Sequence, residues 1–327
     1  MWLLSSSTVK SLIDIKELIP LVEEALIDFS VGASVQPERN GIDLGVNTGL
    51  LEVLIGYLPK RQSMAVKALN SRNDNPRNGR PYIYAYITLF DLNTGEALAV
   101  MDGAALTAFR TAAGSAVATN YLSRADSRRL LLIGTGRQGR AHLEALRSVR
   151  PIETVVVYDI DTERSRAFMQ EHTERTGMDI QVGVSLKDDV ADADIIQLCT
   201  TATDPVILGE WVKAGTHVNS IASYAPSVRE ADTALLQKSK LVTDNSSDAL
   251  RGAGELVVAI ERGEVTADHL YAEIGEIAAG EKPGRETEDE VTFYKSMGMA
   301  VQDVAAATYV YDKALANGLG VNFDLDE

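Results

Sequence analysis

The chain has 327 residues, of which 45% are hydrophobic, and it carries a formal net charge of −16 at pH 7. This length and composition allow a large buried core and are more typical of two domains than of one. The negative charge disfavours nucleic acid and anionic membranes as partners. No apolar run reaches the roughly 20 residues of a membrane span, and the opening MWLLSSSTVKSLI does not have the pattern of a secretion signal. We therefore expect a globular, cytoplasmic protein.

Strand-like stretches separated by Gly, Pro and Asn occupy the chain from Leu51 to Val100: LEVLIGYLP, SMAVKALN, YIYAYITLFD and EALAV. Asn93-Thr94-Gly95 is typical of a hairpin turn, so these stretches predict a mainly antiparallel sheet. In SMAVKALN, alternation places Ala65, Lys67 and Leu69 on one face. Lys67 is then either a guard against aggregation on an edge strand or an ammonium group that lines a pocket.

The next segment, MDGAALTAFRTAAGSAVATNYL from Met101 to Leu122, is predicted to form one long helix of small and apolar residues, with Asp102 as its N-cap. It contains a single guanidinium, at Arg110, and no Asp or Glu lies between Gly103 and Ala125. An unpaired guanidinium is costly to bury. Arg110 must therefore reach solvent, a distant protein carboxylate or the anionic group of a ligand.

The strongest local motif is the glycine turn in RRLLLIGTGRQGRAHLEAL, where Gly134, Gly136 and Gly139 follow an apolar run and precede an amphipathic helix. In a dinucleotide-binding unit, the first glycine makes the tight turn, the second admits the pyrophosphate and the third lets the helix pack on its strand. A second strand, Thr154 to Tyr158, ends at Asp159, about 20 residues after the last glycine.

Asp159 is expected to accept hydrogen bonds from the adenosine ribose, which favours NAD (as NADH) over NADP. Arg164 and Arg166 follow closely and can instead support a 2′-phosphate. Two further apolar runs, ADIIQLCTT and THVNSIASY, predict parallel strands whose carboxyl ends place Thr200 and Ser220 near the cofactor, although ordinary turn chemistry explains these residues equally well.

Metal and thiol chemistry are not expected. The single cysteine, Cys199, lies in an apolar run and is predicted to be a small core residue rather than a nucleophile. The four histidines, at positions 142, 172, 217 and 269, lack the spacing of a metal-binding motif.

Several motifs in the same order resemble the ornithine cyclodeaminase/mu-crystallin family along nearly the full chain: QPER, MAVKALN, LNTGEALAVMDGAALTAFRTAA, IGTGRQG and FYKSMGMAVQDVAAA. The resemblance implies an α/β protein and a homodimer. It implies an α+β dimerisation and substrate domain built from residues 1–116 and 300–327, a central Rossmann NAD-binding domain over 117–299, and an active site between the two domains.

The resemblance also implies roles for individual residues. Arg39, Lys67 and Arg110 match contacts to a substrate carboxylate, and Lys67 is also the expected proton donor or acceptor. The positions implied in cofactor binding, by these matches and by the glycine and strand patterns, are Thr111, Gly134, Gly136, Arg137, Gln138, Asp159, Thr200, Ser220 and Ser296.

One departure from the family pattern bears on the reaction. In the family that this chain resembles, the ornithine cyclodeaminases carry an aspartate in a GADAP-like loop. This chain has Tyr224 at the matching position, in IASYAPSVRE. Without this carboxylate, cyclodeamination loses its base. We therefore expect NADH-dependent reduction of a small 2-imino acid to the L-amino acid, or the reverse oxidation, with Tyr224 as a hydrogen-bond donor to the substrate.

Two alternatives are conversion of ornithine to proline and ammonia, and a non-catalytic, crystallin-like role in binding ligands. The cations Arg72, Arg77 and Arg80 either select a second acidic group on the substrate or belong to a solvated loop.

Overall fold

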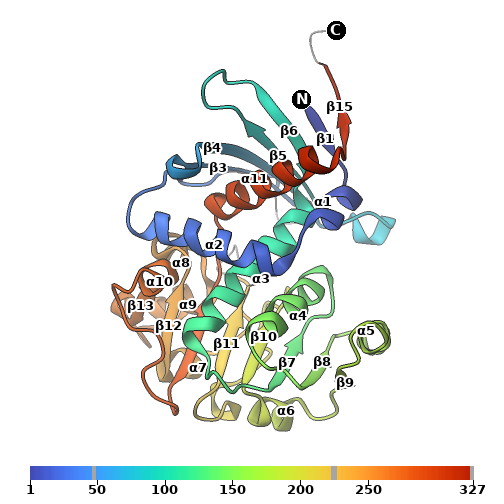
Figure 1. The fold of residues 1–327 in the computed structure, drawn as a ribbon. Helices are drawn as coiled ribbons and strands as arrows, with labels where there is room; N and C mark the ends of the chain where they lie inside the picture. The colour runs from blue at the N-terminus through green and yellow to red at the C-terminus, as the bar shows by residue number, and fades with distance from the viewer. Residues whose placement is uncertain (46–48, 222–226, 325–327) are drawn as a thin grey trace. The chain divides into compact units, whose positions relative to one another are not determined.

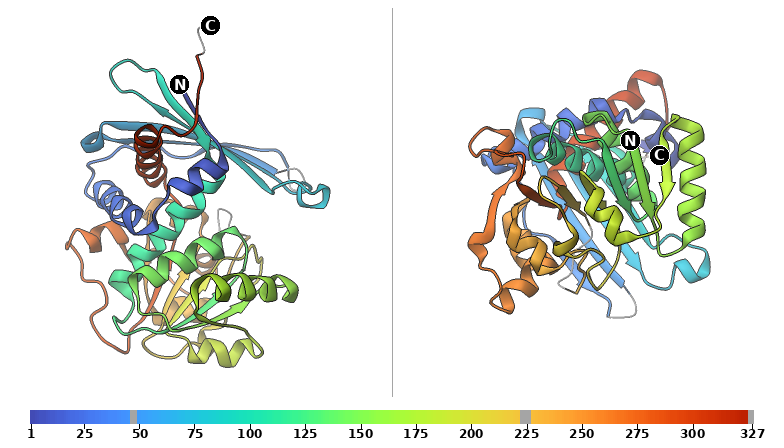
Figure 2. Two further views of the ribbon diagram at one scale, coloured as in Figure 1. Left: turned by 45° about the vertical axis from the view of Figure 1, so that its right-hand side comes forward. Right: turned by 90° about the horizontal axis from the view of Figure 1, so that it is seen from below.

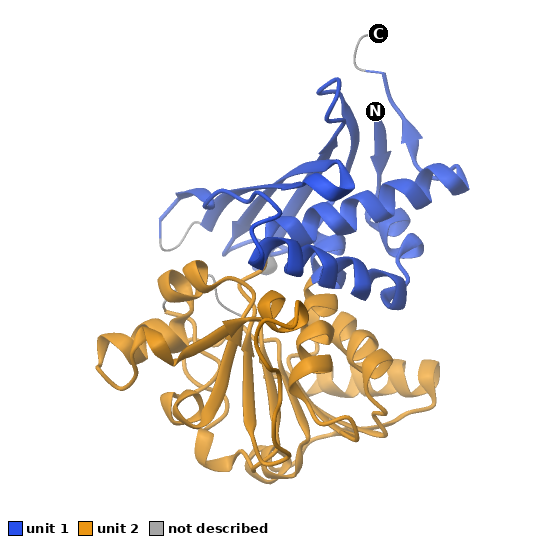
Figure 3. Ribbon diagram, turned by 60° about the vertical axis from the view of Figure 1, so that its left-hand side comes forward, with its two compact units in different colours: residues 1–110, 299–327 blue, residues 111–298 orange. Residues whose placement is uncertain are grey.

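The computed structural model describes residues 1–45, 49–221 and 227–324 (Figure 1). The chain divides into two compact units (Figure 3). Unit 1 combines Met1–Arg110 with Met299–Glu327, and unit 2 is the continuous segment Thr111–Gly298. One boundary between the units falls inside the alanine-rich helix and the other just before the last helix.

Unit 1 is built on a seven-stranded sheet in the order β15-β1-β6-β5-β4-β3-β2. Neighbouring strands run antiparallel except for β1 and β6, which are parallel. The strands are β1 (Trp2–Leu4), β2 (Asn40–Asp43), β3 (Gly49–Leu58), β4 (Ser63–Arg72), β5 (Ile83–Phe90), β6 (Ala97–Asp102) and β15 (Val321–Asn322).

The helices of unit 1 are α1 (Ser6–Leu12), α2 (Ile15–Ser30) and α11 (Ala300–Asn317). They lie on one face of the sheet, with α11 packed against β3, β4 and α2 (Figure 2). The face beneath α11 is buried because its cross-strand row consists of apolar residues on either side of Lys67: Leu54, Ile87 and Met101.

The opposite face of the same sheet carries a mostly apolar row that crosses six strands, with Thr88 as its one polar member. In register order this row is Val321, Leu3, Val100, Thr88, Val66 and Ile55. Its members are partly or fully exposed, and Tyr86, in the adjacent row, is 56% exposed. We call this surface the outer sheet face.

Unit 2 contains an eight-stranded, all-parallel sheet in the order β13-β12-β14-β11-β10-β7-β8-β9. Its strands are rich in Val, Ile and Leu, as expected for a sheet covered on both faces. They are β7 (Arg129–Ile133), β8 (Thr154–Tyr158), β9 (Asp179–Val182), β10 (Ile195–Leu198), β11 (His217–Ser220), β12 (Ser239–Thr243), β13 (Leu270–Glu273) and β14 (Val291–Lys295).

The helices of unit 2 begin with the carboxyl-terminal part of α3 (Gly103–Leu122), which starts in unit 1. The others are α4 (Arg137–Val149), α5 (Thr162–Thr176), α6 (Leu186–Asp192), α7 (Thr233–Lys238), α8 (Ser246–Gly252), α9 (Gly254–Glu261) and α10 (Ile274–Ala278). Short 3-10 helices η1 to η4 span Pro59–Arg61, Pro76–Asn78, Gly209–Trp211 and Ala267–His269.

The predicted α/β fold class is confirmed, and two details of the sequence interpretation need correction. The alanine-rich helix starts at Gly103 rather than at Met101, because Met101 and Asp102 end strand β6. Asp102 still caps it, since its carboxylate accepts a hydrogen bond of 2.6 Å from the backbone of Ala105. The edge-strand interpretation of Lys67 is wrong, because β4 lies between β3 and β5 inside the sheet.

Over the described ranges, none of the helices is long and apolar enough to cross a membrane.

Candidate active site

Lys67 lies on the helix-covered face of β4 and is 2% exposed. The alternation of SMAVKALN turns it inward, where α11 crosses the strand. Its ammonium group donates to Oδ2 of Asp303, in the first turn of α11, and Asp303 is as deeply buried as Lys67. A lysine in a protein core thus has a carboxylate partner from the other end of the chain.

Arg110 reaches the same carboxylate from α3. Its Nε donates to Oδ1 of Asp303 at 2.8 Å, and its Nη1 donates to Oε1 of Gln302 at 3.1 Å. Of the three partners left open by the sequence, the described part of the chain supplies a distant protein carboxylate. Nη2 makes no hydrogen bond within the described residues. The buried Nε2 of Gln302 likewise has no hydrogen-bond partner there, so two adjacent side chains each have a nitrogen without a partner in the described chain.

Arg39 completes a group of positive charges around Lys67. It is half-buried, just before β2, and its charge acts on Lys67 together with that of Arg110. Burial and these two guanidinium groups lower the pKa of Lys67 to about 8, against the opposing effect of Asp303. We call Arg39, Lys67, Arg110 and Asp303 the cation cluster; it brings three basic side chains to one carboxylate, a composition that suits an anionic ligand.

Asp303 was not singled out in the sequence. Burial acts to raise the pKa of its carboxyl group, but Arg110 and Lys67 outweigh burial and hold that pKa below its ordinary value. The residue is therefore a carboxylate in the folded chain. Sequence offered one signal: Asp303 is the lone acid in the apolar run MGMAVQDVAAA, just as Arg110 is the lone base in its helix.

In unit 2, the glycine turn has the shape that a dinucleotide requires. Gly134 has φ of 101°, and a Cβ there would lie 2.3 Å from the carbonyl oxygen of Cys199. A Cβ at Gly139 would lie 2.1 Å from the oxygen of Gly134, so α4 packs against the turn only because this position is glycine. A Cβ at Gly136, by contrast, would meet one atom of the described chain beyond its own helix and neighbours within 4 Å: Nη2 of Arg164, at 3.5 Å. The chain thus leaves room for a phosphate beside the amino end of α4.

Asp159 stands beside this turn at the end of β8. Its Oδ2 accepts hydrogen bonds from the backbone and hydroxyl of Thr135, at 2.9 and 2.7 Å, and its Oδ1 accepts one from the backbone of Asp161 at 3.2 Å. Nη1 of Arg164 lies 3.6 Å from Oδ1. Burial acts to raise the pKa of Asp159, but the Thr135 hydrogen bonds lower it below its ordinary value. Asp159 is therefore a carboxylate in the folded chain, the form that accepts hydrogen bonds from ribose hydroxyls in dinucleotide sites.

The other residues predicted at the start of α4 have different surroundings. Arg137 is exposed at the first position of α4. Gln138 is half-buried, and its Oε1 is buried with no hydrogen-bond partner in the described chain. Thr111 is buried in α3. Arg137 and Gln138 are thus next to the glycine turn in sequence, while Thr111 comes from a different helix.

A buried network joins the carboxyl ends of β10, β11 and β14. The Ser220 hydroxyl donates to Glu230 at 2.8 Å and accepts from Nζ of Lys295 at 2.8 Å, and Lys295 pairs with Glu255 at 2.9 Å. Glu230 also accepts from the backbone of Thr200 at 2.6 Å. Burial and the nearby Glu255 raise the pKa of Glu230, despite the attraction of Lys295.

This network bears on two predicted cofactor contacts. Ser220 is fully buried, and its hydroxyl hydrogen is directed to a protein partner. Thr200 is half-exposed, with its backbone held by Glu230. The glutamates and Lys295 were not singled out in the sequence, because charged residues in strands and loops are normally on the surface.

Ser296 follows β14 and is held in a similar way. Its hydroxyl donates to Oδ2 of Asp244 at 3.0 Å. The same carboxylate accepts from the backbone N–H of Met297, at 2.8 Å to Oδ1, and from that of Gly298, at 2.8 Å to Oδ2. Gly298 has φ of 75°, a value that favours glycine. Asp244 therefore fixes the loop that carries Ser296.

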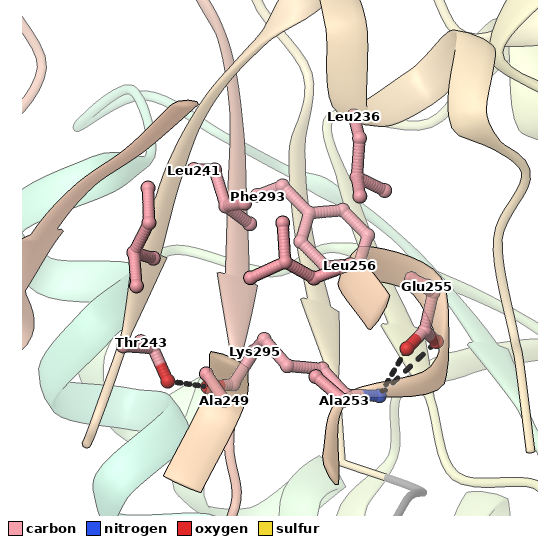
Figure 4. A pocket seen from close by; sticks show the side chains of 10 residues that line it. Leu236, Leu241, Thr243, Ala249, Ala253, Glu255, Leu256, Phe293 and Lys295 are labelled. Carbon is pink, nitrogen blue, oxygen red and sulfur yellow. Dashed lines mark hydrogen bonds and ion pairs between the residues drawn. The ribbon is translucent and has the colours of Figure 1, made fainter. Parts of the chain in front are cut away.

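A small cavity in unit 2 is lined in part by the Lys295–Glu255 ion pair (Figure 4). Its walls are mostly apolar, formed by residues such as Leu236, Leu241 and Phe293. Its volume of about 10 Å³ is that of a single water molecule. This cavity is too small for an amino acid.

The remaining predicted residues lie outside the cation cluster or outside the residues that the structure describes. Arg77 is 85% exposed and pairs with Asp74 at 3.2 Å, as in a solvated loop. Arg80 is exposed, and Arg72 donates to its neighbour's backbone at the end of β4. Tyr224 is outside the described residues. Cys199 follows β10, and burial raises the pKa of its thiol, which disfavours a nucleophilic thiolate.

The model of the ornithine cyclodeaminase/mu-crystallin family matches residues 1–318. The chain belongs to this family. A Delta(1)-pyrroline-2-carboxylate reductase of Bacillus thuringiensis subsp. konkukian is 34% identical over 321 residues, which cover 98% of both chains.

Two solved structures of family relatives are also similar. The Delta(1)-pyrroline-2-carboxylate reductase of Thermococcus litoralis, in complex with NADH and L-proline, has a TM-score of 0.96 and 38% identity, covering 99% of this chain and 100% of its own. An archaeal alanine dehydrogenase dimer with bound NAD has a TM-score of 0.94 and 34% identity, covering 99% of each chain.

Proposed function

We propose that this family member is an NAD(H)-dependent enzyme that reduces a small 2-imino acid to the L-amino acid, or catalyses the reverse oxidation. The observation that supports it most is the cation cluster: buried positive charge with unused donors, built around a lysine whose pKa is lowered to about 8. The glycine turn of unit 2 fits a dinucleotide. The relatives named as pyrroline-carboxylate reductase and alanine dehydrogenase act on substrates of this class.

In this proposal, the substrate carboxylate accepts hydrogen bonds from Arg39 and from the free Nη2 of Arg110. Charge-assisted bonds of this kind are stronger than neutral ones in a buried site. Lys67 holds a proton at Nζ and donates it to the imine nitrogen, and in the oxidative direction it takes the proton back. Tyr224 is proposed from sequence alone as a further donor to the substrate.

The cofactor supplies hydride to the imine carbon when NADH is bound. The turn at Gly134 and Gly136 and the first residues of α4, Arg137 and Gln138, would hold the pyrophosphate, and Asp159 would accept from the adenosine ribose. Thr111, Thr200, Ser220 and Ser296 are proposed contacts on the basis of the family motifs. For Ser220, the buried network supports a simpler role, in which its hydrogen bonds to Glu230 and Lys295 position the carboxyl end of β11.

We also propose that the protein is a homodimer whose subunits associate through the outer sheet face of unit 1. A mostly apolar row across six strands is a large surface to leave in water. The alanine dehydrogenase relative is a dimer, which supports a second copy of this chain as the occupant.

The activity is tested by following NADH consumption with Delta(1)-pyrroline-2-carboxylate, and with pyruvate plus ammonia or methylamine. We expect turnover with at least one imine, and we expect Lys67→Met to reduce kcat on the order of 10²- to 10⁴-fold with NADH affinity unchanged. Tight NADH binding without turnover of any imine would indicate a binding protein instead. Formation of proline and ammonia from ornithine would indicate a cyclodeaminase.

A further inference from the structure

Asp303 joins two buried cations of the cation cluster, Lys67 and Arg110, through hydrogen bonds to its carboxylate. Its Oδ2 accepts from Lys67 on β4, and its Oδ1 accepts from Nε of Arg110 on α3 at 2.8 Å. Each oxygen is thus assigned to a different cation. The carboxylate is 2% exposed, so neither contact is screened by water.

These contacts determine which donors of the cluster stay free. Asp303 accepts from Nε of Arg110 and Gln302 accepts from Nη1, so Nη2 is the nitrogen of this guanidinium that has no hydrogen bond within the described chain. Lys67 has three N–H donors and uses one of them on Asp303. The carboxylate therefore fixes two flexible side chains and leaves part of each available.

We propose that Asp303 is a positioning residue: it orients Nζ of Lys67 for proton transfer to the imine nitrogen and turns Arg110 so that Nη2 meets the substrate carboxylate. This inference rests on the proposed function. Asp303 touches neither reacting atom; it acts through Lys67 and Arg110.

The charges around Lys67 explain why such a residue is needed. Arg110 on α3 and Arg39 before β2 both act against a proton on Lys67, as does burial, and Asp303 on α11 opposes all three. Without the carboxylate, Lys67 would be a buried ammonium between two guanidinium groups, and its neutral form would be favoured near neutral pH. A neutral amine cannot protonate an imine.

The experiment compares Asp303→Asn and Asp303→Glu with Asp312→Asn. Asp312 is an exposed acid on the same helix, outside the cation cluster, so its variant is a matched control for the loss of one negative charge. For each protein we would measure kcat and KM, the pH dependence of both, NADH affinity by fluorescence titration and the pKa of Lys67 by NMR of ¹³C-labelled lysine.

For wild type, we expect imine reduction to fall as pH rises through about 8, because Lys67 loses its proton there. For Asp303→Asn, we expect this limb to move at least about one pH unit lower and kcat to fall on the order of 10²-fold, with NADH affinity unchanged. For Asp303→Glu, we expect the limb to stay in place while kcat falls, since charge is kept and geometry is not. Asp312→Asn should match wild type.

Other outcomes would overturn the proposal. An Asp303→Asn enzyme with an unchanged pH limb, or with an unchanged kcat, would show that Asp303 has only a structural role. If Asp303→Asn does not fold, Asp303→Glu decides: wild-type kcat and KM in that variant would contradict precise positioning.

A failure of the proposed function would look different. If wild type reduces no imine, the lysine titration still tests this inference, because the pKa of Lys67 should fall when Asp303 becomes Asn. An unchanged Lys67 pKa would refute the inference independently of any activity.

Discussion

The carboxylate of Asp159 and the guanidinium of Arg164 stand together beside the glycine turn. In the proposed cofactor site, they would offer opposite charges to the adenosine ribose. Asp159 accepts from a 2′-hydroxyl, as in NAD sites, while an arginine nearby accommodates a 2′-phosphate. Nη2 of Arg164 lies close to Gly136 and its Nη1 lies 3.6 Å from Asp159. If Asp159 binds the ribose as proposed, Arg164 would lie within reach of a 2′-phosphate on it.

We predict that Arg164→Ala weakens NADPH binding about tenfold, the equivalent of one charge-assisted hydrogen bond, and changes NADH binding less than twofold. Fluorescence titration with both cofactors measures the two affinities. Arg166→Ala is the control, because Arg166 is 61% exposed and pairs with Glu163. Equal losses for the two cofactors in Arg164→Ala would contradict a role specific to the 2′-phosphate.

Single residues of the cation cluster were predictable where a charge stood out against its local sequence. Lys67 and Arg110 differ from their surroundings because each is a cation among apolar neighbours. Asp303 has the same property but was missed, since pairing it with residues 193 and 236 positions away depends on how α11 crosses the sheet. The residue pattern of a single helix or strand does not predict how α11 packs across the sheet.

At the scale of elements, the carboxyl end of α3 depends on an arginine from another helix. The guanidinium of Arg150, just after α4, donates to the backbone oxygens of Thr119, Asn120 and Ser123 and to the side chain of Asn120. The last carbonyls of a helix lack the full set of intrahelical donors; Thr119 accepts from Ser123 as well as from Arg150. A cation at this end also matches the helix dipole.

We predict that Arg150→Met lowers the free energy of unfolding of unit 2 by roughly 2–3 kcal/mol, because several partly buried carbonyls lose a charged donor. Urea unfolding measures this loss. In a Trp2→Phe background, Trp211 is the remaining tryptophan and reports on unit 2. Arg128→Met, which breaks a surface pair with Glu153, should cost less than about 1 kcal/mol. Equal effects of the two substitutions would argue against the helix-end role.

Elements with a strong period were predictable, and the shortest ones were not. The strands β3 to β8 and the helix after the glycine turn follow from alternation, buried apolar runs and glycine spacing. Strands β1 and β15 have three and two residues, too few for a period to develop. They exist because they pair with each other and with β6, which is a tertiary property.

For the whole molecule, the outer sheet face provides the test of assembly. Tyr86 is 56% exposed and lies next to the apolar row of that face. If the proposed dimer forms through this face, we predict that Tyr86→Glu yields a monomer, because a buried carboxylate would face apolar groups across the interface. Light scattering after size-exclusion chromatography measures the mass. Val184→Glu, at a 98% exposed position of unit 2, should leave the dimer intact. A dimeric Tyr86→Glu protein would place the interface elsewhere.

Unit 1 is discontinuous in the chain, and this has a consequence for biosynthesis. While the ribosome makes the first segment, Met1–Arg110, the sheet has no α11 to cover Leu54 and Ile87. Lys67 and Arg110 also have no Asp303 to pair with. The continuous segment Thr111–Gly298 meets no such delay and is expected to fold as a unit while translation proceeds. The nascent amino-terminal segment, although made first, is therefore expected to mature last, and during that interval its apolar strands are the part of the protein that most needs a chaperone.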